Sequence, residues 1–340
     1  MPPTAAQRRV LELAQSFRTA AVIIAFAELG ISAQLAAGPL PTERLAAAVG
    51  ADPLALARFL QAAAALDLVV ETPAGWQLTP PAAETLVPTS PRSLAHFLAG
   101  QAAFYRRWGL LSEAIRTGRA PEASRREEDA RDWVRRFTLM LYEIARTTSE
   151  DIARTVLPLL AGSRQPRVLD LGGGHGEYAM ALARSRPDLE AVVFDRPPVI
   201  AVTQELVASQ GLSERVRTLA GDFFHDPLGE GYQLVLLFGV LNGMGEDEAR
   251  FLLRRVHDAL APDGWLAIRA TRPDASSEAR LQHALHDLQM LLATERGHNP
   301  TAAELEHWLE EAGLSELQWR AVDETTALLL ARPQPARAST

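Results

Sequence analysis

A glycine-rich loop that directly follows an acid-containing apolar stretch holds the residues best suited to chemistry in this chain. The stretch Arg167–Leu171 predicts a strand, Gly172 and Gly174 belong to the loop, and the residues from Glu177 onward predict a helix. Glycines let the backbone turn sharply and approach a ligand closely. Asp170 would repel the pyrophosphate of a dinucleotide, whereas it would attract a cation. The ammonium and sulfonium groups of S-adenosylmethionine meet that requirement, so we predict a site for this cofactor.

Two further acids stand at the ends of later predicted strands. The apolar stretch Glu190–Asp195 ends in Asp195, whose carboxylate we expect to accept hydrogen bonds from both ribose hydroxyls. A third strand, predicted at 215–219, runs into Asp222 and Phe223, which we expect to bind the adenine amino group and to cover the ring face. Because loops at the carboxyl ends of parallel strands converge on one crevice, these residues form a single predicted site.

The glycine pattern by itself leaves a second interpretation open. Residues 174–179 also fit the G-x-G-x-x-A pattern of dinucleotide-binding proteins, and such short patterns often match by chance. The ordered acids at strand ends favour S-adenosylmethionine. His175 lies between the loop glycines, and its side chain is expected to point away from the ligand. Strands that alternate with helices predict an α/β, Rossmann-like domain for this half of the chain.

Composition indicates a soluble enzyme and argues against several other classes of protein. The chain has 340 residues, a formal net charge of −8 and no cysteine. The negative charge argues against non-specific binding to nucleic acid or to an anionic membrane, and thiolate metal sites are excluded. No signal peptide is evident, and the apolar run at 20–27 is shorter than the roughly 20 residues of a membrane span. We therefore expect a cytoplasmic protein with no metal, no nucleic-acid partner and no membrane partner.

The chain divides into two predicted domains, a helical winged-helix dimerisation domain at 1–105 and a Rossmann-like cofactor-binding domain at 106–340. In the first domain, helices at Thr42–Val49 and Pro53–Ala65 precede a strand–turn–strand at 66–78. This order of elements is typical of a winged helix.

The winged helix is better suited to pairing with a second copy than to DNA. A DNA-reading helix carries basic and amide side chains, but the second helix offers only Arg58 and Gln61. The first helices, between residues 10 and 30, carry more apolar surface than one small domain buries, which predicts a homodimer. Farther along, the mixed-charge stretch at 118–132 predicts a solvated loop and the start of a helix.

These features together resemble the S-adenosylmethionine-dependent O-methyltransferases of the plant caffeate/hydroxyindole type, in their bacterial natural-product branch. The resemblance covers nearly the whole chain and rests on the residues at 27–31, 45–50, 77–79, 169–176, 221–228 and 261–264. It implies a class I methyltransferase domain, a homodimer joined through the N-terminal domain, and a small-molecule aromatic substrate. Phe238 stands where the family often has a lysine, and we count it among the cofactor-binding residues.

The catalytic base that the resemblance implies is missing. Asn242 occupies the position of the histidine that removes the acceptor's proton, and an amide cannot do so at neutral pH. The family's supporting glutamate aligns with Ala270. We predict that Asn242 orients the acceptor, and that His286 or His283, on a helix expected at 276–294, assists proton removal.

Three classes of function remain open at this point. The leading one is an enzyme that transfers a methyl group to oxygen, carbon or nitrogen of a small aromatic or polyketide-like acceptor. The second keeps the cofactor and the fold but catalyses a decarboxylation, a hydroxylation or a cyclisation. The third is a non-catalytic regulatory protein, which is disfavoured because a dead site need not retain its cofactor contacts.

Overall fold

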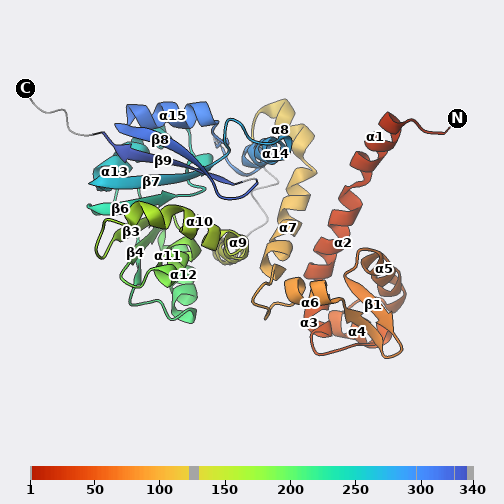
Figure 1. Ribbon diagram of the computed structural model, residues 1–340. Coiled ribbons are helices and arrows are strands. Elements are labelled where there is room, and N and C mark those ends of the chain that lie inside the picture. The colour runs from red at the N-terminus through yellow and green to blue at the C-terminus, as the bar shows by residue number, and fades with distance from the viewer. Residues whose placement is uncertain (1, 122–129, 296, 325, 335–340) are drawn as a thin grey trace, which may run out of the picture. The chain divides into compact units, whose positions relative to one another are not determined.

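The computed structural model describes residues 2–121, 130–295, 297–324 and 326–334 (Figure 1). The chain forms two compact units, Met1–Gly109 and Leu110–Thr340, whereas the sequence predicts a domain boundary after residue 105. Of the predicted solvated stretch at 118–132, residues 122–129 lie outside the described residues.

The first unit is helical apart from one short hairpin. Helices α4 and α5 have the bounds expected from the sequence, while the hairpin begins at Val69 and is shorter than expected. The elements are, in order, α1 (Ala5–Gln15), α2 (Phe17–Glu28), α3 (Ile31–Leu35), α4 (Thr42–Val49), α5 (Pro53–Ala65), β1 (Val69–Thr72), β2 (Gly75–Leu78), α6 (Pro80–Leu86) and α7 (Ala95–Trp108).

A helix cap, a hydrogen bond between distant residues and an apolar core hold the hairpin and its helices together. Asp52 accepts a hydrogen bond of 2.8 Å from the backbone N–H of Ala55 and so caps α5. The buried Trp76 of β2 donates from Nε1 to Thr42 Oγ1 at 3.0 Å, which ties the hairpin to the start of α4. Trp76 also belongs to the apolar core of this unit, together with Leu45 and Leu60.

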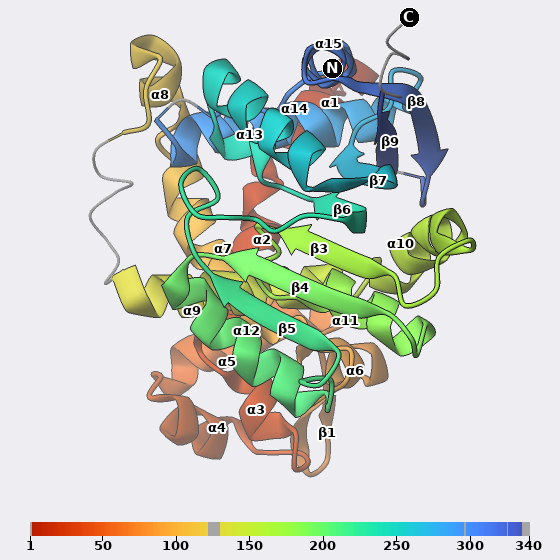
Figure 2. The ribbon, with the colours of Figure 1, turned by 90° about the vertical axis from the view of Figure 1, so that its left-hand side faces the viewer.

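The second unit is built on a sheet of seven strands with helices on both faces (Figure 2). Its elements are α8 (Leu111–Thr117), α9 (Ala130–Ala145), α10 (Ser149–Val156), β3 (Arg167–Leu171), α11 (Glu177–Ser185), β4 (Glu190–Asp195), α12 (Pro197–Ser209), β5 (Val216–Ala220), β6 (Tyr232–Leu237), α13 (Glu246–Ala259), β7 (Leu260–Ala270), α14 (Ser277–Ala293), α15 (Ala302–Glu311), β8 (Leu314–Ala321) and β9 (Ala327–Pro333), with short 3-10 turns at Leu157–Leu160 and Leu241–Gly243.

The strand order of the sheet creates one crevice at its carboxyl edge. The order is β5-β4-β3-β6-β7-β9-β8, with β3 parallel to both β4 and β6. Chain connections therefore run outward from β3 in both directions, and ligands of such sheets bind where this reversal occurs. Strand β9 pairs antiparallel with β7 and with β8, so the sheet ends in an antiparallel edge.

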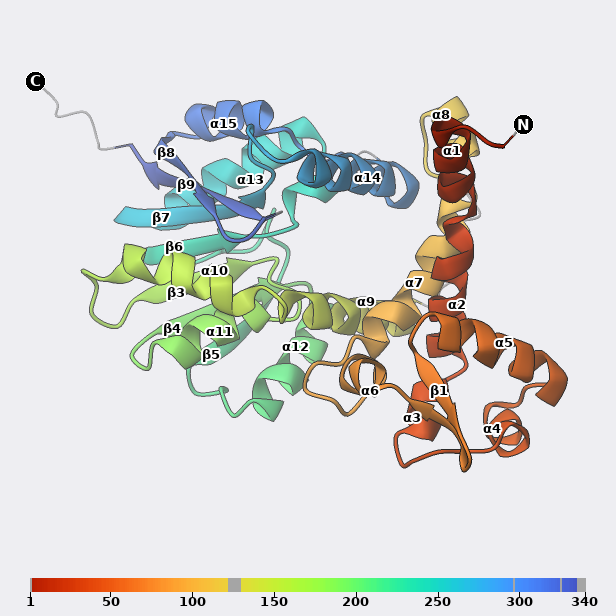
Figure 3. The same cartoon turned by 45° about the vertical axis from the view of Figure 1, so that its right-hand side comes forward.

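Helices cover both faces of the sheet (Figure 3), and an apolar core lies on each face. On one face, α13 and α15 contribute Leu253, Val256 and Trp308 to a core that includes Val235 of β6. On the other face, buried residues of α10 and α11 pack against the same strands, and Met180 of α11 is fully enclosed. The continuous apolar runs of β3 and β6 follow from this burial on both sides.

The N-terminal helices present an exposed apolar face. Four of their side chains, which we call the N-terminal apolar face, are between 52% and 64% exposed: Val10, Leu11, Leu13 and Phe17. Helices α1 and α2 follow one another nearly in line (Figure 1), and the segment Ala5–Glu28 is long and apolar enough to cross a membrane by length and composition alone. Because this segment exceeds the apolar run at 20–27, length does not exclude a membrane span.

We expect a second copy of the chain to cover the N-terminal apolar face, since exposed apolar patches of this kind mark association sites. Replacing Leu13 and Phe17 together with Glu would place charge in the interface. Light scattering should then report a monomer of 37.0 kDa in place of a wild-type dimer.

Leu54→Glu provides the matched control, because Leu54 is 77% exposed on α5 of the same unit and lies outside the N-terminal apolar face. This variant should remain dimeric. A wild-type protein that scatters as a monomer and sediments with phospholipid vesicles would contradict pairing through this face.

Candidate active site

One open cavity of about 540 Å³ lies at the carboxyl edge of the sheet, where the strand order reverses. Its walls come from α9 and from the loops that follow β3, β4, β5 and β6. The structure places all seven residues predicted to bind the cofactor around this cavity: Asp170, Gly172, Gly174, Asp195, Asp222, Phe223 and Phe238.

Asp170 is a buried carboxylate that lacks full hydrogen bonding. Its Oδ2 atom has no hydrogen-bond partner among the described residues. Burial raises the pKa of Asp170 to about 7, a backbone hydrogen bond from Ala179 opposes the shift, and the charge of Asp195 adds to it. A cationic group bound in the cavity would relieve this cost, because it favours the ionised carboxylate.

The glycine loop is shaped by contacts that leave no room for side chains. Gly172 has φ +67°, and a Cβ atom there would lie 2.5 Å from Val240 Cγ2. A Cβ atom on Gly173 would overlap the carboxylate of Asp170. Gly173, which the sequence analysis did not select, is therefore the residue that lets Asp170 lie beneath the loop.

Asp195 and Asp222 are held by backbone N–H groups of their own loops. Asp195 accepts from the N–H of Gly174 at 2.9 Å and of Arg196 at 2.7 Å, and burial raises its pKa. Asp222 accepts from the N–H of Phe224 at 2.8 Å, and this bond lowers its pKa. Both carboxylates are thus fixed in place on the cavity wall.

Aromatic side chains form another part of the wall. The rings of Phe238 and Tyr178 meet edge to face, with centroids 5.0 Å apart. His175 is buried against Tyr178 and is among the residues that line the cavity. Its Nδ1 accepts from the Glu177 N–H at 3.0 Å, and burial, aided by the charge of Arg269, lowers its pKa to about 3. His175 is therefore a neutral donor at Nε2.

Asn242 lies beside the cavity, in a smaller hollow that it shares with Arg269 and Asn299. Its Nδ2 group is 3.0 Å from His286 Nε2 and donates to Asn299 Oδ1 at 2.9 Å. Burial lowers the pKa of His286, and the charges of His283 and Arg269 lower it further. The imidazole of His286 is therefore neutral at pH 7, and Nε2 can accept from the amide.

Asn299 joins the predicted catalytic residues into one network. Its Nδ2 lies 2.9 Å from His283 Nδ1, and its backbone N–H donates to Asp287 Oδ1 at 2.7 Å. The structure thus brings together Asn242, His283 and His286, the three residues with predicted catalytic roles. Asn299, which links them, was not among the residues predicted from the sequence. Its loop is held tightly, since a Cβ on Gly297 would lie 2.5 Å from the Asn242 carbonyl oxygen.

Arg269 is a second residue that the sequence analysis did not select. It stands near the carboxyl end of β7, where its Nη1 donates to Tyr178 Oη and its Nη2 to Thr326 Oγ1, both at 3.3 Å. An arginine in the apolar run at 265–270 was the available signal.

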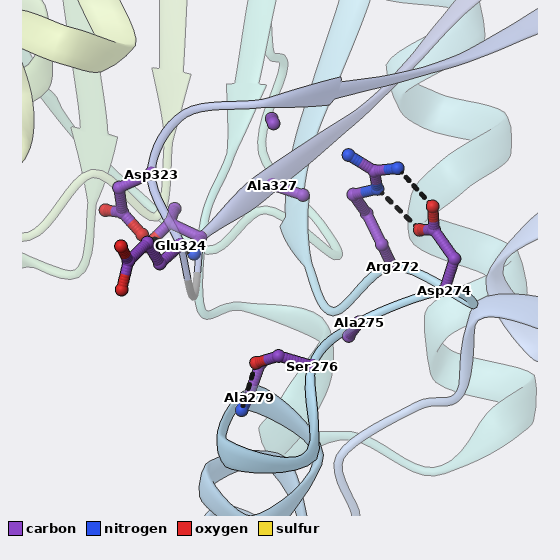
Figure 4. Close-up of a pocket in the computed structure, with 10 residues that line it drawn as sticks. Arg272, Asp274, Ala275, Ser276, Ala279, Asp323, Glu324 and Ala327 are labelled. Atoms are coloured by element: carbon purple, nitrogen blue, oxygen red, sulfur yellow. Dashed lines mark hydrogen bonds and ion pairs between the residues drawn. The ribbon is translucent and has the colours of Figure 1, made fainter.

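A second surface hollow of about 140 Å³ lies between the start of α14 and the turn that precedes β9 (Figure 4). Arg272 on its wall binds Asp274 through two hydrogen bonds, one of them 2.7 Å long from Nε. Its cation is therefore already paired. Among the described residues no cluster of three or more possible metal ligands occurs.

Comparisons with known proteins agree with this architecture. The O-methyltransferase dimerisation domain matches residues 11–89, and the O-methyltransferase domain matches residues 117–315. The 3-hydroxy-5-methyl-1-naphthoate 3-O-methyltransferase of Streptomyces sahachiroi is 31% identical over 312 residues, covering 90% of this chain and 89% of the relative. The 8-amino-8-demethylriboflavin N,N-dimethyltransferase of Streptomyces davaonensis is 32% identical, covering 92% of this chain and 91% of the relative.

The fold also matches a solved enzyme. Human N-acetylserotonin methyltransferase, crystallised in complex with SAM, has a TM-score of 0.84 and 27% identity, covering 98% of this chain and 99% of that one. The predicted fold, a class I methyltransferase domain preceded by a helical dimerisation domain, is confirmed, and the dimerisation-domain match supports a homodimer. The chain belongs to the S-adenosylmethionine-dependent O-methyltransferase family and is a methyltransferase that uses S-adenosylmethionine.

Proposed function

We propose that this enzyme methylates a small aromatic or polyketide-like acceptor in natural-product biosynthesis. The observation that carries the proposal is the meeting of the acidic cavity with the network of Asn242, Asn299 and His286 at one edge of the sheet. The two Streptomyces relatives named above act on a naphthoate and on a flavin, at oxygen and at nitrogen respectively. Both are methyltransferases, and neither points to the non-methylating alternative.

The cavity residues fit S-adenosylmethionine, which supplies a methyl group carried on a sulfonium. Asp170 would accept the ammonium group, since its buried Oδ2 lacks a partner in the described structure. Asp195 would accept the ribose hydroxyls, and Asp222 the adenine amino group, with Phe223 against the ring. Gly172 and Gly174 would let the loop approach the cofactor, and Phe238 would close the wall beside Tyr178.

Asn242 and His286 would divide the work of the missing base. The Nδ2 group of Asn242 is occupied by His286 and Asn299, while its Oδ1 makes no hydrogen bond with the described residues. That oxygen is free to accept from the hydroxyl or amine of the acceptor and so to orient it. His286, neutral at pH 7, would take the proton, and His283 would act through Asn299.

Positioning supplies the rest of the rate. Holding the acceptor in a defined orientation makes the bimolecular reaction effectively unimolecular. This can lower the activation free energy by up to several kcal/mol without any base. The half-buried hydrogen-bond chain Asn242–Asn299–His283 would hold the amide in one orientation, so that the acceptor oxygen or nitrogen meets a fixed partner. We further propose a cytoplasmic homodimer with no nucleic-acid or membrane partner, in line with the net charge of −8.

Asp170→Asn tests the cofactor site. The raised pKa means that ionising Asp170 costs free energy of folding as the pH rises toward and through 7, so the ligand-free variant should be more stable than wild type at pH 8, by about 1–3 kcal/mol. S-adenosylhomocysteine should bind the variant about 10- to 100-fold more weakly at pH 8. Wild-type affinity should fall as the pH drops from 8 to 6, and variant affinity should not.

Calorimetry and thermal unfolding provide these measurements. Asp263→Asn, at an exposed aspartate outside the cavity, is the control and should match wild type. Undiminished cofactor affinity in Asp170→Asn would remove the carboxylate from the proposed site.

His286→Ala tests the assignment of the base, with turnover of hydroxylated naphthoates measured as methylated product. Loss of a general base should lower turnover on the order of 100-fold. Asn242→Ala should lower it about tenfold, as expected for one orienting hydrogen bond. The acidic limb of the wild-type pH profile should disappear in His286→Gln, because protonation of His286 generates that limb.

His307→Ala provides the control, since His307 is an exposed histidine on α15, away from the network. Wild-type turnover in both His286→Ala and His283→Ala would contradict base assistance. A large increase in turnover in the Asn242→His variant would show that the site is that of an ordinary O-methyltransferase, which Asn242 makes less active.

A further inference from the structure

Arg269 is a partly buried cation without an anionic partner. Within the described part of the chain no carboxylate lies within ion-pair distance of its guanidinium, and its two hydrogen bonds, each 3.3 Å, go to the hydroxyls of Tyr178 and Thr326. A guanidinium has five N–H donors, so most of its capacity remains unused. A partly buried charge that makes only long hydrogen bonds to neutral groups costs free energy of folding. A bound anion would offset that cost.

Other partly buried arginines of this unit make shorter contacts. Arg186 binds Asp188 at 2.9 Å, and Arg250 binds Glu246 at 2.7 Å. Arg255 donates to the carbonyl oxygen of Asp226 at 2.8 Å. Arg269 differs from them because both of its hydrogen bonds are 3.3 Å long.

The surroundings of Arg269 are positive or neutral. The guanidinium of Arg269 lies beside Tyr178, on the face of β7 that packs against α11. Ile268 and Ala270 point to the opposite face, where the hollow of about 10 Å³ that contains Asn242 lies. The nearest titratable groups on α14 are His283, His286 and Asp287, and Asp287 already accepts from the N–H of Asn299. A planar anion would match both the charge and the forked geometry of the guanidinium.

We propose that Arg269 binds a carboxylate of the acceptor, so that the substrate class is an aromatic hydroxy or amino acid bound as its anion. This inference rests on the proposed function, because it takes Asn242 and His286 as the place of the reacting group. The carboxylate of the cofactor's methionine part offers the same chemistry. We assign the acceptor because the charge of Arg269 acts on His286, which lies beside Asn242, and because Arg269 is absent from the residues around the acidic cavity.

The assignment also links binding to the base. The charge of Arg269 lowers the pKa of His286. A bound carboxylate would offset that charge, so the pKa of His286 rises when the acceptor is in place. His286 would then become a stronger base only in the loaded site.

The test compares two ligands that differ only in the carboxylate, 3-hydroxy-2-naphthoate and 2-naphthol. Calorimetry is carried out on the full-length protein saturated with S-adenosylhomocysteine. Wild type should bind the acid at least about tenfold more tightly than the naphthol, as expected for a charge-assisted bidentate pair. Arg269→Gln should reduce this ratio to about one, and Arg269→Lys should retain part of it.

Arg272→Gln is the matched control, since Arg272 lies nearby in the chain and is already paired with Asp274. It should keep the wild-type ratio. Affinity for S-adenosylhomocysteine reports folding of each variant and should not change in Arg269→Gln.

Two outcomes overturn the carboxylate site of the acceptor. One is a wild-type protein with no preference for the acid. The other is an Arg269→Gln variant that keeps the preference but loses affinity for S-adenosylhomocysteine, which would assign Arg269 to the cofactor. An Arg269-dependent preference without methylated product from any acid would instead refute the proposed function and leave the anion site in place.

Discussion

The carboxylate of Asp170 imposes the constraint on which the cofactor-binding edge of the sheet depends. It lies buried at the end of β3, directly beneath the loop, with one oxygen lacking a partner among the described residues. Because a Cβ atom on Gly173 would overlap the carboxylate, the residue above Asp170 must be glycine. The conformation of the loop therefore determines the electrostatics of Asp170. If the backbone moved away, water would reach the carboxylate and its preference for a cation would be lost.

The strand order extends this constraint to the rest of the site. Strand β3 lies between β4 and β6, so the loops after these strands meet at the same edge as Asp170. Asp195 reaches back from the β4 loop to the N–H of Gly174, and this bond fixes the glycine loop from its neighbour. Helices α11 and α13 pack on opposite faces of the sheet. Because both faces are covered, nearly every residue of β3 and β6 is buried.

Residues with a local signature could be predicted from the sequence, and residues defined by distant contacts could not. The bounds of β3, β4 and β6 follow from apolar runs that end at acids or glycines, and those acids do line the cavity. Asn299 and Arg269 gain their significance only through partners far away in the chain, such as Asn242 and Tyr178. The burial of His175 likewise depends on ring contact with Tyr178, the second residue of α11, which the pattern of a glycine loop does not indicate.

In the proposed mechanism the basic group stands on α14 and not at the position of Asn242, where the resemblance implies a histidine. The amide donates toward Nε2 of His286, an arrangement that requires the neutral imidazole with its proton on Nδ1. In that mechanism Asn242, on the loop after β6, orients the acceptor, and His286, on α14, accepts its proton. In the proposed mechanism the acceptor first donates to Asn242 Oδ1, and its proton then passes to His286 Nε2, where it takes the place of the Asn242 amide. Burial lowers the pKa of His286, the charges of His283 and Arg269 lower it further, and the neutral form of the imidazole is thereby favoured.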